Sequence, residues 1–444
     1  MKRLFTQNLI DWKNNKDKMP LLVYGSRQVG KSTSIFEFGK NHYANVILCN
    51  FEHNEPLQKI FEKDLDPNRI VLEIEKLTSE TISRRHTLLF FDEIQECPKA
   101  ITSLKYFCEQ APAYHIIAAG SLLGVGLNRK TKVKDENGNT IEKGVSFPVG
   151  KVNLLTVYPM TFKEFLMEIN PHIISSIEES FAANKPLSEL LHNKALELYR
   201  TYLFTGGMPK AVLEYSEKKD FDFVRVTQNS ILSLYYSDMG KYTTQSEQVK
   251  IGAIYNSIPY QLAKENKKFQ YSLVGSGVRA SGYEIGLHWL KNAGLIIQCN
   301  KVKEGKYPLS FYTDALSYKI YMNDVGLLNA KSNIAKNRIL SEIDFTVESK
   351  GAMTENYVAQ EMVANGLIPY YWESKGKAEV DFVVQIGDNS IPVEVKSATN
   401  TQSKSLNEYI KKYSPAYSIR ISAKNFGFEN GIKSVPLYAV WCIK

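Results

Sequence analysis

The sequence predicts an α/β protein of several domains with a parallel sheet near its N-terminus, and three observations support this fold class. The chain has 444 residues, and at roughly 150 residues per domain we expect about three domains. In the first third of the chain, short apolar runs alternate with helical patterns, an order typical of parallel sheets covered by helices on both faces. The composition, 43% hydrophobic and 23% charged, excludes collagen-like and disordered chains.

Five short apolar runs are the expected strands of this parallel sheet. They are residues 20–24, 45–49, 87–91, 115–120 and 152–157. In open α/β sheets, ligands bind at the carboxyl ends of the strands. Polar residues that directly follow these runs are therefore the first candidates for a functional site.

The first run leads directly into the sequence G-S-R-Q-V-G-K-S, Gly25 to Ser32, which is a complete G-x-x-x-x-G-K-[ST] phosphate loop. Its glycines let backbone N–H groups point at phosphate oxygens, and the helix that follows directs its positive end to the same place. We expect Lys31 to contact the β- and γ-phosphates of ATP and Ser32 to bind Mg²⁺. A glycine turn that binds no nucleotide is the weaker alternative. The predicted nucleotide-binding residues of this loop are Gly25, Ser26, Arg27, Gln28, Val29, Gly30, Lys31, Ser32 and Thr33.

The third run ends in two carboxylates, Asp92 and Glu93. We expect Asp92 to reach Mg²⁺ through water and Ser32, and Glu93 to orient and deprotonate the attacking water. An acidic pair placed after a phosphate loop favours ATP hydrolysis over nucleotide binding alone. Ser121, which follows the fourth run, is the candidate sensor of the γ-phosphate.

A polar stretch and a helical region come next. Residues 127–148 are polar with an Asn-Gly turn, which predicts an exposed β-hairpin insertion that either contacts a partner or DNA or is a solvated loop. From residue 159 to 236 the apolar spacing is helical. Gly206-Gly207-Met208-Pro209 interrupts it, and we interpret this sequence as a tight turn between helices.

Residues 246–313 follow the order of a winged helix. A helix around Val249–Lys264 precedes a second helix in A-S-G-Y-E-I-G-L-H-W-L-K-N, which Gly294 caps. A strand at 295–297, a basic loop and a strand at 309–312 complete the expected wing. The basic residues of this segment could contact phosphates; they are Lys267, Lys268, Arg279, Lys291, Lys301, Lys303 and Lys306. A winged helix that serves as a plain protein spacer is the alternative.

The positive charge is concentrated late in the chain. The formal net charge is +8, and residues 264–306 and 396–424 are the two segments with a clear excess of Lys and Arg. Such an excess favours a polyanionic partner such as DNA, although two solvated faces without a partner would look the same.

The last candidate site is a β-hairpin. Residues 378–386 alternate as a half-buried strand, and I-P-V-E-V-K, Ile391 to Lys396, returns. With Asp388 and Asn389 as the loop residues, Asp381 would lie opposite Lys396, and Val383 opposite Glu394.

The alternation places Asp381, Glu394 and Lys396 on one face of this hairpin. Two carboxylates can bind Mg²⁺, and an adjacent lysine can activate water or stabilise a phosphate in transition. Glu355, on a predicted helix at 354–360, could add a third acidic ligand. A polar hairpin face with a cross-strand Asp–Lys pair is the alternative, because D-x-n-E-x-K is a loose pattern.

Together these motifs resemble the prokaryotic AAA-type ATPases that have a C-terminal restriction-endonuclease-like domain of the PD-(D/E)xK type, a family of unknown function. The resemblance rests on G-S-R-Q-V-G-K-S, L-L-F-F-D-E-I-Q, A-A-G-S, S-F-P-V-G-K-V, Y-P-M-T-F-K-E-F-L, G-G-M-P, T-E-N-Y-V-A-Q-E and E-V-D-F-V-V…I-P-V-E-V-K-S. The chain departs from the family at Leu122, where a second polar residue is usual.

The resemblance implies a role for each candidate residue. The catalytic residues would be Lys31, Glu93, Asp381, Glu394 and Lys396. The metal ligands would be Ser32, Asp92, Glu355, Asp381 and Glu394.

The sequence patterns and the resemblance together predict four segments: an AAA-type domain at 1–160, a helical lid at 161–240, a winged helix at 241–335 and a nuclease-like domain at 336–444. We expect an ATPase whose nucleotide cycle controls a nuclease-like domain acting on DNA. The alternative is an ATP-dependent switch that binds DNA or a protein through a catalytically silent nuclease-like domain.

The expected partner is DNA, bound through the winged helix and the basic segments. An arginine finger supplied by a neighbour would require a homo-oligomer, with Arg129, Arg200 and Arg225 as candidates. No signal peptide or membrane span is expected, which indicates a cytoplasmic protein.

Overall fold

The computed structural model divides the chain into two compact units. It describes residues 1–126, 130–134, 140–144, 146–275, 280–341, 347–374, 378–396 and 404–444. The N-terminal unit contains residues 2–158 together with 292–294, and the C-terminal unit contains residues 159–291 and 295–444 together with Met1.

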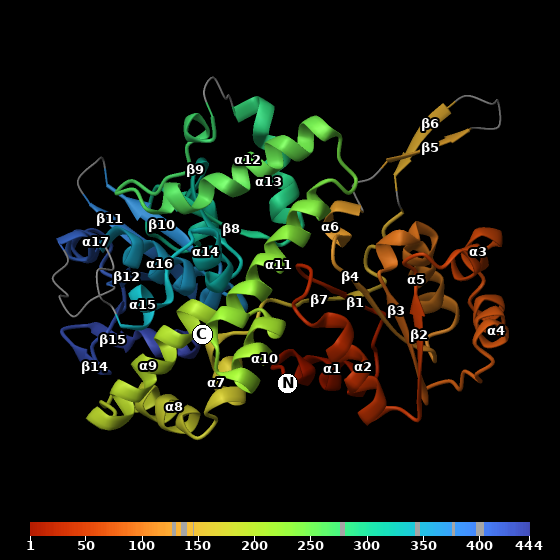
Figure 1. Cartoon of the computed structure of the whole chain (residues 1–444), viewed down its shortest axis with the longest axis horizontal. Coiled ribbons are helices and arrows are strands. Elements are labelled where there is room, and N and C mark those ends of the chain that lie inside the picture. The colour runs from red at the N-terminus through yellow and green to blue at the C-terminus, as the bar shows by residue number, and fades with distance from the viewer. Residues whose placement is uncertain are drawn as a thin grey trace. The chain divides into compact units, whose positions relative to one another are not determined.

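The N-terminal unit is built on a five-stranded, fully parallel sheet with the strand order β2-β3-β4-β1-β7 (Figure 1). Its strands are β1 Leu21–Tyr24, β2 Asn45–Asn50, β3 Thr87–Asp92, β4 His115–Gly120 and β7 Asn153–Thr156. These are the five predicted runs, so the predicted parallel sheet is confirmed. The helices of this unit are α1 Phe5–Asn14, α2 Lys31–His42, α3 Glu55–Lys63, α4 Pro67–Thr78, α5 Pro98–Gln110 and the short α6 Leu123–Gly126.

Helices cover both faces of this sheet, as predicted. On one face, Leu89 and Phe91 of β3 share a buried core with residues of α3, α4 and α5. On the other face, α2 approaches so closely that a Cβ at Gly39 would lie 2.9 Å from Leu88. Because strand side chains alternate, successive apolar residues serve both cores, which explains the continuous apolar runs in the sequence.

The predicted insertion after the fourth strand is a β-hairpin. β5 Lys130–Lys134 pairs antiparallel with β6 Thr140–Gly144. The Asn-Gly turn predicted between them lies outside the described residues.

The C-terminal unit begins with the predicted helical region. Its first helices are α7 Phe162–Ile169, α8 Ile173–Ala183, α9 Glu189–Thr205, α10 Pro209–Lys218 and α11 Phe221–Met239, followed by α12 Gln245–Leu262 and α13 Ala280–Asn292. Thr161 and Thr244 start α7 and α12 with capping boxes, which satisfy backbone N–H groups that a helix start leaves open.

The G-G-M-P sequence is the predicted turn between helices α9 and α10, and it also ties three segments together. The N–H of Gly207 donates a hydrogen bond to Asp324 Oδ2 at 2.6 Å, and its carbonyl accepts one from the N–H of Met160 at 2.6 Å. A Cβ at Gly207 would lie 2.0 Å from the carbonyl oxygen of Met160. The close backbone approach therefore requires glycine at this position.

An eight-stranded sheet forms the rest of the C-terminal unit, in the order β14-β15-β13-β12-β11-β10-β8-β9. Its strands are β8 Ile296–Val302, β9 Thr313–Met322, β10 Tyr370–Glu373, β11 Glu379–Ile386, β12 Asn389–Val395, β13 Ser418–Ser422, β14 Gly427–Glu429 and β15 Ile432–Pro436. The accompanying helices are α14 Val325–Lys331, α15 Lys336–Leu340, α16 Val347–Ala364 and α17 Lys404–Tyr413.

The structure corrects the second strand of the predicted wing. Residues 309–312 form a 3₁₀-helix, and the strand that pairs antiparallel with β8 is β9, which starts at Thr313. Leu309 is fully buried in a core with Trp372 and Tyr409, so the apolar signal at this point comes from a buried turn. β8 also pairs in parallel with β10, so the expected wing strands belong to the large sheet.

The structure also corrects the register of the C-terminal hairpin. Phe382 pairs with Val393 and Ile386 with Asn389, so the two loop residues are Gly387 and Asp388. Gly387 has a φ of 56°, the left-handed conformation that tight hairpin turns require of one central residue. Because the pairing shifts by two residues, every side chain stays on its predicted face.

Within the residues that the structure describes, no helix is both long enough and apolar enough to cross a membrane.

Candidate functional site

The phosphate loop connects β1 to α2 with the close packing that its glycines predict. A Cβ at Gly25 would lie 2.0 Å from the carbonyl oxygen of Val157, which leaves no room for a side chain. Gly30 has a φ of 86° and precedes the first residue of α2. The loop therefore ends at a helix N-terminus, where backbone N–H groups attract phosphate.

Lys31 lies inside this loop. Its ammonium group donates hydrogen bonds to the carbonyl oxygens of Gly25 at 2.9 Å and Ser26 at 2.8 Å. Burial lowers the pKa of Lys31 to about 8, although the nearby carboxylates of Glu93 and Asp92 act in the opposite direction. Phosphate oxygens carry negative charge, so they are stronger acceptors for this ammonium than two neutral carbonyls.

Ser32 and Asp92 lie together at the carboxyl ends of the strands. The Ser32 hydroxyl donates a 2.9 Å hydrogen bond to Asp92 Oδ1. Burial raises the pKa of the Asp92 carboxyl group. A hydroxyl and a carboxylate are the hard oxygen ligands that Mg²⁺ prefers, so this pair suits the predicted cation.

Glu93 is held by two side chains. Gln95 Nε2 donates to Glu93 Oε2 at 2.5 Å, and the Ser121 hydroxyl donates to the same oxygen at 3.4 Å. The predicted sensor residue therefore contacts the predicted base. Gln95 was not among the predicted site residues, although its position two residues after Glu93 in L-L-F-F-D-E-I-Q was a signal for it.

Arg3 supports the loop from the residues before α1, and no sequence motif had assigned a role to it. Its guanidinium donates to the carbonyl oxygen of Val29 at 2.5 Å and to that of Tyr158 at 2.8 Å. Only 7% of Arg3 is exposed. A buried arginine that bonds two backbone carbonyls fixes the loop against the segment after β7.

The other predicted loop residues differ in their surroundings. Val29 and Ser26 are buried, whereas Thr33 is exposed on the first turn of α2. Arg27 lies 3.8 Å from Glu52.

Two of the candidate arginine fingers, Arg225 and Arg129, differ in what the structure describes of them. Arg225 bonds inside the C-terminal unit, to Asn329 at 3.2 Å and to the carbonyl oxygen of Ile334 at 2.8 Å. Arg129 lies outside the described residues, as does Arg279 among the predicted phosphate contacts.

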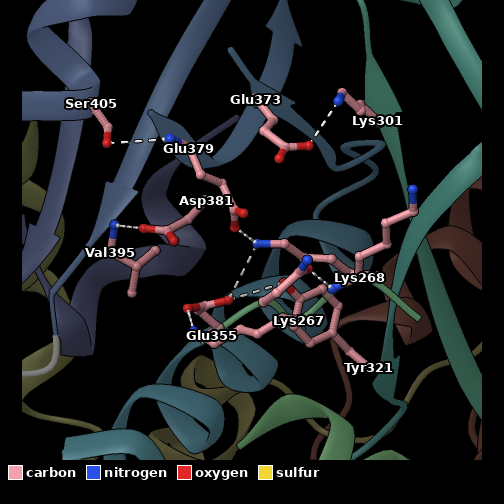
Figure 2. A network of polar contacts seen from close by, with 12 residues as sticks. Lys267, Lys268, Lys301, Tyr321, Glu355, Glu373, Glu379, Asp381, Val395 and Ser405 are labelled. Atoms are coloured by element: carbon pink, nitrogen blue, oxygen red, sulfur yellow. Dashed lines mark hydrogen bonds and ion pairs between the residues drawn. The ribbon is translucent and has the colours of Figure 1, made fainter. Parts of the chain in front are cut away.

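The C-terminal hairpin and α16 bring the other predicted site residues together in a largely buried cluster, and Figure 2 shows Glu355 and Asp381 of this cluster. Glu355 and Glu394 are 4% and 3% exposed. The carboxyl group of Asp381 accepts a 2.8 Å hydrogen bond from the N–H of Val395, and Lys396 pairs with Glu394 at 2.6 Å. Burial, together with the charges of Glu355 and Glu394, raises the pKa of Asp381 to about 8.

Two lysines that the sequence did not assign to this site neutralise its carboxylates. Lys267, predicted as a phosphate contact of the winged helix, bonds to Glu355 Oε1. Lys319 of β9 is completely buried, 2.5 Å from Glu379 Oε1 and 3.8 Å from Glu355 Oε2. Burial alone would lower the pKa of Lys319, but the surrounding carboxylates of Glu355, Glu379 and Asp381 outweigh it and raise that pKa.

A signal for Lys319 was present in the sequence. It stands in S-Y-K-I-Y-M, Ser317 to Met322, as a charge within an otherwise apolar strand. A buried lysine requires an acidic partner, so this pattern indicates a carboxylate facing the strand.

Among the residues that the structure describes, no three His, Cys, Asp or Glu side chains are grouped so that they could hold a metal ion. The metal role predicted for Glu355, Asp381 and Glu394 therefore stays a prediction.

Three family models match separate parts of the chain. An AAA domain matches residues 17–166, and two domains of unknown function, DUF8612 and DUF4143, match residues 196–338 and 350–440. Residues 17–166, with their phosphate loop and acidic strand end, are thus an AAA-type P-loop ATPase domain. The two C-terminal matches carry no functional description, so the winged-helix and nuclease-like assignments remain predictions.

Two solved structures are among those to which the chain is similar. The Walker-type ATPase PABY2304 of Pyrococcus abyssi is 16% identical with a TM-score of 0.43, over 74% of this chain and 94% of that one. The Holliday junction branch migration motor RuvB of Thermotoga maritima is 14% identical with a TM-score of 0.29, over 67% of this chain and 89% of that one. No curated protein matches the chain.

Proposed function

We propose that this protein hydrolyses ATP and that its nucleotide cycle controls the C-terminal unit, which acts on DNA through a nuclease-like site. The observation that carries the proposal is the presence of two buried charged sites, one at the phosphate loop and one at the C-terminal hairpin. The first site has the parts of an ATPase. The second combines Glu355 of α16, Asp381 of β11 and Glu394 of β12 with Lys396, which directly follows β12.

In the first site, each residue has a task that its contacts support. The loop N–H groups and Lys31 bind the phosphates, and Lys31 exchanges its two carbonyl partners for phosphate oxygens. Ser32 and Asp92 would hold Mg²⁺, which would supply positive charge that neutralises the phosphates. Glu93 accepts a proton from water, and the hydrogen bond from Gln95 fixes the direction of its carboxylate.

In the second site, the side chains differ in how well a substrate can reach them. The side chain of Lys396 is 33% exposed, so its ammonium can contact a phosphate of the DNA backbone. The side chain of Lys319 is 0% exposed and holds the carboxylates of Glu355 and Glu379 in place. Glu394 orients Lys396 through their ion pair.

The test is cleavage of supercoiled and linear DNA in Mg²⁺ or Mn²⁺, with and without ATP. Wild type is compared with Asp381→Asn and Lys31→Ala. The proposal predicts that Asp381→Asn loses cleavage and keeps ATP hydrolysis, and that Lys31→Ala loses ATP hydrolysis and changes the rate of cleavage. Wild-type protein that hydrolyses ATP but never cuts DNA under any of these conditions would refute the nuclease part.

A second candidate function is an ATP-dependent switch that binds DNA or a protein through a catalytically silent domain. The observation that favours it is the neutralisation of the carboxylates by Lys267 and Lys319. This candidate predicts ATP-dependent and salt-sensitive binding without cleavage. Absence of cleavage separates it from the first candidate, and a pull-down with ATP, ADP and no nucleotide tests whether its binding depends on ATP.

A further inference from the structure

Loop 303–312 and helix α17 form one continuous surface on the C-terminal unit that neither charged site explains. The hydroxyl of Tyr409 in α17 donates a 3.2 Å hydrogen bond to the carbonyl oxygen of Gly305, which is 104 residues away in the sequence. A Cβ at Gly305 would lie only 2.0 Å from that hydroxyl. The loop therefore lies directly against the helix, and the two basic segments of the sequence meet here.

Positive charge dominates this surface. Its exposed lysines are Lys303, Lys306, Lys404, Lys411 and Lys412. The acidic residues among them are Glu304, which pairs with Lys306 at 2.5 Å, and Glu408. An excess of lysines on one face attracts a polyanion.

An aromatic side chain stands out from the same loop. Phe311 is 82% exposed and Tyr307 is 50% exposed, while Leu309 between them is fully buried. Leu309 anchors the turn in the core beside Trp372. The N–H of Phe311 donates to the carbonyl oxygen of Pro308 at 3.1 Å. Leu309 and this hydrogen bond thus fix the backbone of the turn, and the Phe311 ring projects into solvent.

We propose that loop 303–312 and α17 form a binding surface for single-stranded DNA, in which the lysines contact phosphates while Phe311 and Tyr307 stack on unpaired bases. This inference rests on the proposed action on DNA and specifies the form of the strand. Exposed aromatic rings beside a basic surface are the physical basis of single-strand binding, because every base offers a face for stacking. In a duplex the bases stack on each other, and a ring gains access only by prising them apart.

The position of α17 relates this surface to the charged cluster. The N–H of Glu379 donates a 3.3 Å hydrogen bond to the hydroxyl of Ser405 in the first turn of α17 (Figure 2). Glu379 is the partner of Lys319 in the cluster. A strand lying along α17, which is about 15 Å long, would therefore run from the aromatic loop to the carboxylates.

The experiment measures fluorescence anisotropy of a labelled single-stranded oligonucleotide and of the duplex with the same sequence, using the full chain at several salt concentrations. The variants are Phe311→Ala and the double variant Lys411→Gln/Lys412→Gln. Leu190→Ala is the matched control, because Leu190 is an apolar residue of α9 with 80% exposure.

We expect wild type to bind the single strand more tightly than the duplex. Phe311→Ala should weaken single-strand binding on the order of tenfold. The double lysine variant should lower the slope of log affinity against log salt by about 0.7 for each phosphate that the protein no longer neutralises. Leu190→Ala should bind as wild type does.

Duplex binding as tight as single-strand binding, with single-strand affinity that Phe311→Ala leaves unchanged, would overturn this inference and leave the proposed function intact. Single-strand binding without DNA cleavage would support this inference and refute the nuclease part of the proposed function. Binding to vesicles of anionic phospholipid, with no oligonucleotide binding, would also overturn the inference and assign the surface to a membrane.

Discussion

The ion pair between Lys267 and Glu355 is the contact through which the charged cluster can best be tested for stability. The substitution Lys267→Met removes the ammonium group and keeps most of the side-chain volume. Glu355 then retains Lys319 at 3.8 Å and a 3.2 Å hydrogen bond from the Tyr321 hydroxyl.

The structure gives the expected size of this effect. The side chains of Lys267 and Glu355 are 17% and 5% exposed, so the pair is largely removed from water. Removing one partner of a buried pair typically costs about 3–5 kcal/mol, because the other charge stays buried. The two remaining contacts of Glu355 place this variant near the lower limit, at about 3 kcal/mol. With an unfolding entropy of about 2.1 cal/mol/K per residue and roughly 280 residues in the unit, the melting temperature should fall by about 5 °C.

Differential scanning calorimetry of the full chain is the assay, and Lys336→Met is the matched control. Lys336 pairs with Asp222 at 3.1 Å, but the two side chains are 51% and 77% exposed. Exposed pairs contribute at most about 1 kcal/mol. The control should therefore shift the transition of the C-terminal unit much less.

An equal, small shift in both variants would refute the assignment of Lys267 to a buried cluster. A second arm adds Mn²⁺ to the Lys267→Met protein. If the carboxylates form a cation site, the ion stabilises the variant by about 2.7 kcal/mol at roughly a hundredfold excess over its dissociation constant. Unchanged melting under these conditions would argue against the predicted metal role.

Three further predictions concern other parts of the chain. Glu93→Gln should still bind ATP, as measured with a fluorescent nucleotide, but its rate of phosphate release should fall about 100- to 10,000-fold. Loss of ATP binding in this variant would contradict the assignment of Glu93 as the base. Gly207→Ala should lower the free energy of unfolding, measured by urea denaturation, by about 1–3 kcal/mol, because the added Cβ would clash with the carbonyl oxygen of Met160. The control Gly282→Ala has open space around its position in α13, so it should be neutral or stabilising by up to about 1 kcal/mol. Burial raises the pKa of Glu361 to about 8 in the folded protein, whereas a glutamate in the unfolded chain has a pKa of about 4.3. Between these two pH values the folded protein binds a proton that the unfolded chain has released. The free energy of unfolding should therefore fall by about 1 kcal/mol per pH unit as the pH rises through this range. Glu361→Gln, which keeps an acceptor for the N–H of Phe162, should show a flatter dependence in urea unfolding at about pH 5 and pH 8, and a parallel dependence would contradict the shift.

The N-terminal unit could be predicted from the sequence almost completely because its signals are local. A buried parallel strand is one continuous apolar run, and the phosphate loop follows such a run directly. The contacts that the sequence missed there are those of Arg3 and Gln95. Arg3 binds backbone carbonyls of Val29 and Tyr158, and no side-chain pattern records a partner of that kind.

The C-terminal unit could be predicted only in part because its contacts are long-range. The hairpin faces followed from strand alternation, which is why the two-residue error in register left Asp381 and Glu394 on the predicted face. The lysines that balance the cluster come from a loop and from β9. Lys267 reaches Glu355 across 88 residues of sequence, and local periodicity carries no information about such a pair.

The balance of charge in the cluster separates the roles of its three lysines. Lys319 has no exposed surface, Lys267 has 17% and Lys396 has 33% of its side chain exposed. An ammonium without access to solvent cannot meet a substrate phosphate, so Lys319 serves the carboxylates alone. Lys396 can contact a phosphate once its ammonium group separates from Glu394. Burial alone would lower the pKa of Lys396, but the charge of Glu394 raises it, so the side chain stays charged. A nuclease and a silent binding module would both use Lys396 in this way to bind a phosphate. For this reason cleavage, not binding, distinguishes the two proposed functions.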